Sequence, residues 1–170
     1  MKIEIMSGGE VIVVVNDLLD EYRLRLSSQL EISCRRFVNS SIDGDSFMVV
    51  CKDDSGCASL ACGYHVDSEL GTINIPFVLV RRDITPLIRG RSLIMAINAF
   101  LKITQEYSNY SFFATATPKA RRIINKLITP PFKLVGVMQN YFTHGEHNED
   151  AYLFWIPSIV QSNKLDGKEV

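Results

Sequence analysis

The pattern of apolar and polar positions divides the first third of the chain into one short strand and a longer helical stretch. Val11–Val15 is an unbroken apolar run that predicts a first strand, and the polar pair Asn16-Asp17 after it can cap a helix. From Leu18 to about Phe37 the apolar residues recur at helical spacing, and Ser27-Ser28 is a predicted break. We therefore expect one or two helices after the strand.

The period then changes from helical to strand-like. Phe47–Cys51, Ala58–His65 and Thr72–Val80 are apolar or alternating, and turn-forming residues separate them, which predicts a three-strand antiparallel meander. Pro76 lies inside the third of these strands, where it cannot donate a ladder hydrogen bond. That strand is expected to be bulged or partly unpaired at Pro76.

The second half of the chain alternates helices and strands. Gly90–Tyr107 is apolar over much of a helical circumference, which predicts a helix buried against a sheet. The elements expected after it are a strand at Ser111–Thr117, a helix from Pro118 to about Leu127, and strands at Phe132–Phe142 and Ala151–Ile156 joined by the polar segment Thr143–Asp150. This order predicts one α+β domain over residues 1–160 with a mixed, mainly antiparallel sheet, followed by a fraying polar tail at 161–170.

Composition narrows the class of protein. The chain has 170 residues, 46% hydrophobic and 22% charged, with a net charge of −1, which is typical of a globular domain and gives no global attraction to nucleic acid or a membrane surface. It lacks an apolar run of the ~20 residues that span a bilayer and a signal-peptide pattern. The four cysteines are then expected as free thiols in a reducing compartment, so a cytoplasmic location is predicted.

The charge is distributed unevenly. Residues 81–126 hold nine basic and two acidic side chains, a net charge of +7. Within this segment, Arg89-Gly90-Arg91-Ser92 lies at the predicted start of a helix, where backbone N–H groups lack intrahelical partners and the helix dipole is positive. Glycine permits close approach of a phosphate, so the segment predicts a pyrophosphate site; the alternative is a solvated loop.

The order of elements, the bulged strand and the arginine-glycine turn that opens a buried helix resemble the GNAT superfamily of acyl-CoA-dependent acyltransferases. The resemblance covers about residues 10–157 and is clearest over Ile73–Phe142. It implies a GNAT-like sheet with helices on both faces, and acetyl-CoA or another acyl-CoA as cosubstrate. It also implies cofactor-binding residues: a pyrophosphate held by Arg89, Gly90, Arg91 and Ser92, and a pantetheine arm contacted by the backbone of Val78, Leu79 and Val80.

The match to the family's R/Q-x-x-G-x-G/A motif is imperfect in both possible registers. With Arg89 first, Ser92 and Ile94 occupy the two small positions, and Ile94 is bulky. With Gly90 fourth, Gly90 and Ser92 are both small, but Leu87 replaces Arg or Gln. We prefer the second register on steric grounds.

The predicted catalytic residues depart further from the family. Ile124 stands where many members have a proton-donating tyrosine, and an isoleucine cannot transfer a proton. The remaining candidates are His65, as a base at a strand end, with Tyr64 beside it, and Tyr141 as a donor on the late hairpin. The alternative for His65 is a structural role. His144 and His147 lie in a polar segment without a converging ligand set, so no metal site is predicted.

The function predicted from the resemblance is direct transfer of an acyl group, in the first instance acetyl, to an unknown amine. The alternative is a catalytically inactive GNAT-fold protein that acts as a binding or structural subunit, with a protein partner or a second copy of itself. The short length and divergent motif also resemble acetyltransferase-like proteins of tailed bacteriophages, which would place it in the host cytoplasm or the virion. Nucleic-acid binding through the +7 segment is a third reading, and it would require strongly salt-dependent affinity.

Overall fold

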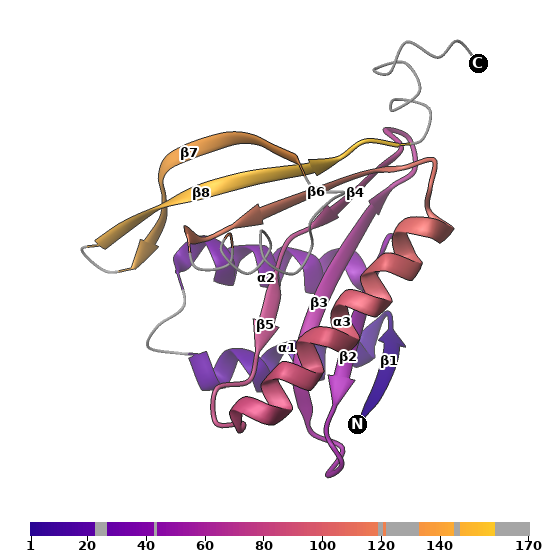
Figure 1. Cartoon of the computed structure of the whole chain (residues 1–170), viewed down its shortest axis with the longest axis vertical. Helices are drawn as coiled ribbons and strands as arrows, with labels where there is room; N and C mark the ends of the chain where they lie inside the picture. Colours follow the sequence, from indigo (N-terminus) through magenta and orange to yellow (C-terminus); the bar gives the residue numbers. More distant parts are fainter. Residues whose placement is uncertain (23–26, 43, 119–120, 122–132, 145–146, 159–170) are drawn as a thin grey trace.

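The computed structural model of the chain describes residues 1–22, 27–42, 44–118, 121, 133–144 and 147–158. Three helices and eight strands are defined there (Figure 1). In chain order they are β1 (Lys2–Met6), α1 (Gly9–Tyr22), α2 (Ser28–Ile42), β2 (Ser46–Lys52), β3 (Ala58–Asp67), β4 (Thr72–Ile75), β5 (Val78–Val80), α3 (Pro86–Glu106), β6 (Ser111–Ala116), β7 (Lys133–His144) and β8 (His147–Ile156).

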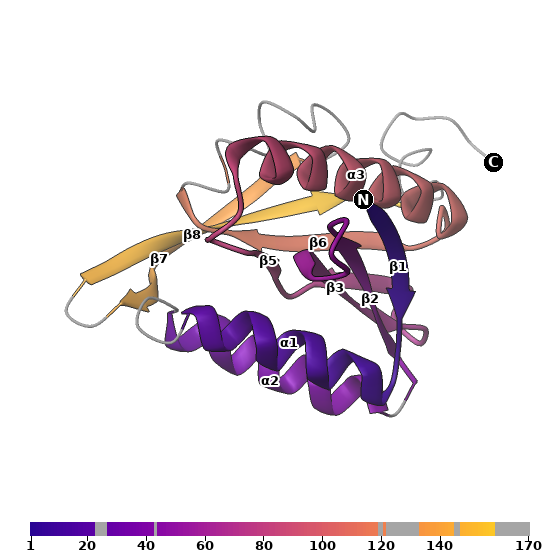
Figure 2. The same cartoon turned by 90° about the horizontal axis from the view of Figure 1, so that it is seen from below.

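One twisted sheet organises the molecule. Its strand order is β1-β2-β3-β4-β6-β8-β7, with β5 paired to β3 beside this path. All pairs are antiparallel except β4 with β6, which is parallel. Helices α1 and α2 cover one face and α3 covers the other (Figure 2). The predicted α+β class, the mainly antiparallel sheet and the helices on both faces are confirmed.

Each face of the sheet carries its own hydrophobic core. On the side of α1 and α2, Phe37 and Phe77 pack edge to face with ring centroids 5.0 Å apart, among the buried residues of both helices and of β2 and β3. On the side of α3, Phe100 packs against Phe112 with centroids 6.0 Å apart. The sheet is therefore packed on both sides, and β2 and most of β3 are buried.

The prediction of a strand at Val11–Val15 is wrong, because these residues lie inside α1. Val11, Val15 and Leu18 are completely buried, while Val13 is 71% exposed. This is the i, i+4, i+7 spacing of one buried helical face, so packing overrides the preference of β-branched residues for strands. The first strand is instead β1, an alternating segment that was not predicted.

The predicted break near Ser27-Ser28 is confirmed, and two helices result. The Ser27 hydroxyl accepts a hydrogen bond from the Leu30 backbone N–H at 3.2 Å, as a helix N-cap does. The predicted meander is confirmed: its strands are β2, β3 and, in place of one third strand, the two short strands β4 and β5. The strand predicted at Ser111–Thr117 is β6.

The late hairpin is longer than predicted. The segment Thr143–Asp150, expected as a polar connection, is largely strand, and the ladder of β7 and β8 extends to His144 paired with His147. Most of the predicted helix at Pro118–Leu127 and the tail at 161–170 lie outside the described residues.

Candidate functional site

The parallel pair β4–β6 separates after four residues. Thr72–Ile75 pairs with Ser111–Ala114, but beyond Ile75 the chain turns away and β5 pairs with β3 instead. The last two residues of β6, Thr115 and Ala116, continue along β8. Figure 1 shows β5 and β6 diverging from this point. We call the space that opens between β5 and β6 the strand gap.

Pro76 and Gly63 produce the separation. Proline has no N–H to continue the ladder, as expected from the sequence, and Phe77 follows it. The Phe77 carbonyl accepts from the Gly63 N–H at 3.2 Å, and its ring lies directly over Gly63: an added Cβ there would be 2.8 Å from Phe77 Cε1. The absence of a side chain at Gly63 thus allows Phe77 to occupy the core and direct β5 toward β3.

The backbone of β5 has one side toward β3 and the other toward the strand gap. The Phe77 carbonyl and the Arg81 N–H both bond to β3, the latter to the Ser59 carbonyl at 2.9 Å. Because hydrogen-bonding direction alternates along a strand, Leu79 also faces β3, and Val78 and Val80 direct their backbone groups toward the gap. Of the three predicted pantetheine contacts, Val78 and Val80 have the required orientation, whereas the Leu79 side chain is 1% exposed and belongs to the core.

The start of α3 differs from the sequence-based expectation. The helix begins at Pro86, not at Gly90, with Thr85 as N-cap accepting from the Ile88 N–H at 3.3 Å. Threonine followed by proline is a favourable N-cap and first-turn pair, a signal that the sequence analysis overlooked. The Arg89 N–H bonds to the Thr85 carbonyl at 3.0 Å, so the expectation of unpaired amides from Arg89 to Ser92 is wrong.

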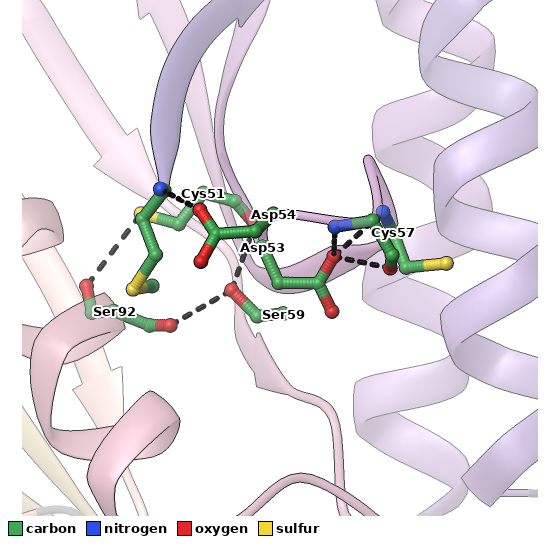
Figure 3. Close-up of polar contacts among 8 residues, drawn as sticks. Cys51, Asp53, Asp54, Cys57, Ser59 and Ser92 are labelled. Carbon is green, nitrogen blue, oxygen red and sulfur yellow. Dashed lines mark hydrogen bonds and ion pairs between the residues drawn. The ribbon is translucent and has the colours of Figure 1, made fainter.

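Ser92 holds α3 against the sheet. Ser92 is fully buried, and its hydroxyl lies 2.7 Å from the Ser59 hydroxyl (Figure 3). The Ser92 hydroxyl also bonds to the Ile88 carbonyl at 2.9 Å. Ser59 donates to the Cys51 carbonyl at 2.9 Å, and the Cys51 thiol lies 3.5 Å from the Ser92 carbonyl. The hydroxyl predicted to lie at a ligand site therefore faces the interior, while Gly90 has open space around its Cβ position.

Three arginines give the region around the start of α3 a positive charge. Arg82, Arg89 and Arg91 are exposed, and Arg89 Nη2 donates to the Arg82 carbonyl at 3.0 Å. They lie on the loop that follows β5 and on the first two turns of α3. An anion at this end of the strand gap would meet guanidinium groups, not unpaired amides.

On the opposite face, His65 lines a pocket of about 280 Å³ next to the strand gap. His65 on β3 pairs with Asn74 on β4, two residues before Pro76. Its Nδ1 lies 2.9 Å from the Ser46 hydroxyl. The pocket is lined by Ser33, Arg36, Phe37, Ser40, His65, Asn74 and Pro76. We call it the α2 pocket, because four of these residues come from α2.

The other two candidates for proton transfer lie elsewhere. Tyr64 is 1% exposed, stacked on Phe47 at 5.0 Å, and burial raises its pKa well above the usual range of a phenol, so it stays protonated within the core. Tyr141 on β7 is 39% exposed and its ring packs edge to face on Phe142. Among the described residues no hydrogen bond or ring contact joins Tyr141 to His65. His65 lines the α2 pocket, and Tyr141 is not among the residues that line it.

Arg36, Ser46 and Asn74 were not predicted from the sequence as residues of the site. Ser33, Arg36 and Ser40 are spaced at helical intervals and share one face of α2, a pattern that could have been noticed. Ser46 and Asn74 reach the site only through strand pairing, because each is the register partner of His65. Such pairing cannot be read from spacing along the chain.

Comparisons with known proteins place the fold. No family model and no curated protein matches the chain. Among solved structures, a variant of the spermidine N-acetyltransferase SpeG from Vibrio cholerae matches with TM-score 0.64 and 12% identity over 99% of this chain and 100% of that one. An acetyltransferase of the GNAT family from Desulfovibrio desulfuricans matches with TM-score 0.62 and 12% identity, covering 92% and 98%. A nourseothricin acetyltransferase matches with TM-score 0.53 and 16% identity, covering 68% and 67%. The fold is therefore the one found in GNAT acetyltransferases, as the resemblance implied.

The same structure bears on the membrane prediction. Among the described residues, no helix combines the length and the apolar character needed to cross a bilayer.

Proposed function

We propose that this protein transfers an acyl group from acetyl-CoA or another acyl-CoA to an amine. The observation that carries the proposal is the separation of β5 from β6 at Pro76, where the parallel pairing of β4 with β6 stops and β5 pairs with β3 instead. The likeness of the fold to acetyltransferases supports the same reading.

The residues around the strand gap fit an extended, amide-containing, phosphorylated ligand. Val78 directs its backbone groups into the gap, where an amide of a pantetheine arm could bond to them as an added strand would, and Val80 lies two residues further along the same edge. Arg82, Arg89 and Arg91 supply positive charge for the phosphates at the start of α3. Gly90 leaves the surface between these arginines open, which keeps it in the proposed site even though its amide lies within the helix.

Transfer requires two proton movements. The amine nitrogen bonds to the acyl carbon while the carbon–sulfur bond breaks, so the amine must lose a proton and the leaving thiolate must gain one. His65 is the proposed base, because it lies in the α2 pocket beside the gap. Tyr141 stays the predicted donor to the thiolate. Most of the rate gain would come from holding amine and thioester in contact, without a covalent enzyme intermediate.

The inactive alternative gains no support from the structures that share the fold, which are those of acetyltransferases. Under the inactive alternative, the protein would form no acylated product with any amine. Nucleic-acid binding through the basic segment would instead give an affinity that collapses at high salt.

The test is the formation of an N-acetylated product. The protein is incubated with acetyl-CoA and a panel of amines, and products are identified by mass spectrometry. We expect at least one amine to be acetylated, and His65→Gln to lower kcat by about 100-fold, the usual contribution of a general base. Thr104→Ala, on the far end of α3, serves as the control variant and should leave the rate unchanged. Absence of product with every amine tested would contradict the proposal.

A further inference from the structure

The α2 pocket lacks the groups that would bind a polycation. Its seven lining residues include Arg36 and His65 but no carboxylate. A polyamine site needs acidic side chains to offset the cost of removing several ammonium groups from water. The spermidine acetyltransferases that share the fold are thus a poor guide to the acceptor of this chain.

Arg36 is distinguished from its neighbour Arg35 by its surroundings. Arg35 forms an ion pair with Glu31 one helical turn away, at 2.7 Å. Arg36 is also exposed but lines the α2 pocket, and among the described residues no ion pair joins it to a carboxylate. An exposed guanidinium that lines a pocket without acidic side chains can bind an anionic group of a ligand, and it prefers a carboxylate in a two-bond geometry.

Hydrogen bonds fix which nitrogen of His65 faces the ligand. Three bonds form a chain: His65 Nδ1 to the Ser46 hydroxyl at 2.9 Å, Ser46 to the Ser40 hydroxyl at 2.9 Å, and Ser40 to the Phe37 carbonyl at 3.0 Å. The carbonyl can only accept, so Ser40 must donate to it. Ser46 then donates to Ser40, and the proton on His65 Nδ1 donates to Ser46.

This direction has a chemical consequence. A neutral imidazole with its proton on Nδ1 has a lone pair on Nε2, which can accept a proton. The carbonyl at the end of the chain therefore selects the tautomer in which His65 can act as a base toward the pocket. Ser46 is 2% exposed, so water does not compete readily for its bond to the ring.

We propose that the α2 pocket binds an amine that also carries a carboxylate, with Arg36 on the carboxylate, His65 Nε2 taking the proton from the amine, and Ser46 positioning the imidazole. This inference rests on the proposed acyl transfer and adds the class of acceptor to it. A volume of about 280 Å³ accommodates an acceptor of amino-acid size.

The experiment compares acceptors that differ only in charge. Glycine and β-alanine are tested against their amides, with spermidine as the polycation, and kcat and KM are measured with acetyl-CoA. We expect the carboxylates to have the higher kcat/KM. Amine basicity cannot produce this preference, because the amides, having the more acidic ammonium groups, offer more free amine at neutral pH.

Variants separate binding from chemistry. Arg36→Gln should raise KM for the carboxylate acceptors about 10- to 100-fold, leave their kcat nearly unchanged, and leave KM for the amides unaltered. Arg35→Gln, on the same helix but paired with Glu31, is the matched control and should change neither constant. Ser46→Ala should lower kcat with little change in KM, and Ser46→Thr, which keeps the hydroxyl, should restore it.

The outcomes distinguish the two levels of the argument. Acetylation of amides or of spermidine in preference to carboxylates, or equal KM values for the wild type and Arg36→Gln, would overturn the acceptor assignment and leave acyl transfer standing. If no amine is acetylated, the proposed function itself fails, and this inference fails with it.

Discussion

The four cysteines show how position alone decides the reactivity of one residue type. Cys34, Cys51 and Cys62 are buried, and burial raises the pKa of their thiols to about 12, about 11 and about 12. A buried protonated thiol is a poor nucleophile. Cys57 lies in the exposed turn between β2 and β3 (Figure 3). Three of the four cysteines therefore behave as small buried hydrophobic residues.

Thiol labelling tests this difference. A thiol reagent at pH 8 should modify one site quickly in the native protein, and Cys57→Ser should abolish that reaction. The other three thiols should become reactive only on unfolding, because their raised pKa values keep them protonated up to strongly alkaline pH. Rapid native labelling of the Cys57→Ser variant would contradict the described packing.

Ser92 shows that a small residue at one position can have a reason other than ligand binding. In the preferred register it stands at a small position beside the expected phosphate. In the structure a small residue is also needed there, but for packing: its hydroxyl bonds to Ser59 on β3 and to the helix backbone. The small residue that the motif calls for at this position therefore serves the packing of α3 on the sheet.

At the scale of elements, the strands and the gap were more predictable than the helix starts. The turn-forming residues around β2 and β3 and the proline at 76 are local signals, and the structure follows them. The start of α3 was predicted four residues late because Gly90 was given more weight than the Thr85-Pro86 pair. For α1, an apolar run of β-branched residues hid a helical face that only packing on the sheet reveals.

The site residues likewise divide into those with a local signal in the sequence and those brought together only by the fold. His65 was predicted from its place at a strand end, and Val78 and Val80 were predicted from the family resemblance. Arg36 and Ser46 were missed because they approach His65 from other elements, across distances of many residues along the chain.

The close contact between Gly63 on β3 and the Phe77 ring predicts how a substitution at Gly63 affects stability. Gly63→Ala should lower the free energy of unfolding by about 1–3 kcal/mol, the range for overpacking a tight core. The added methyl would meet Phe77 at 2.8 Å and Phe37 at 3.1 Å, and both rings are buried. Urea denaturation measures the change.

A second substitution checks the cause. In the Gly63→Ala background, Phe77→Leu should cost less stability than it does alone, because the smaller side chain relieves the clash. Additive effects, or a Gly63→Ala change below about 0.5 kcal/mol, would show that the ring can move aside and that Gly63 does not fix the bulge.

At the scale of the whole molecule, the two faces of the sheet carry different parts of the proposed site. Helices α3 and α2 lie on opposite faces of the sheet (Figure 2), so the arginines at the start of α3 and the pocket lined by residues of α2 belong to opposite sides of it. A donor that enters along β5 from the side of α3 would present its reactive end to an acceptor held beside α2. The proposed direct transfer through the gap fits this arrangement and requires no nucleophilic residue.

The central claim, that the strand gap binds an acyl-CoA, is tested most directly by calorimetric titration with acetyl-CoA, using desulfo-CoA and ATP as controls. We expect micromolar affinity for both coenzymes and none for ATP. Val78→Pro removes an N–H that faces the gap and not β3, and Gly90→Phe fills the open surface between the arginines, so each should weaken binding at least about 10-fold while the circular dichroism spectrum stays native. No binding at millimolar acetyl-CoA, or unchanged affinity in both folded variants, would contradict the account.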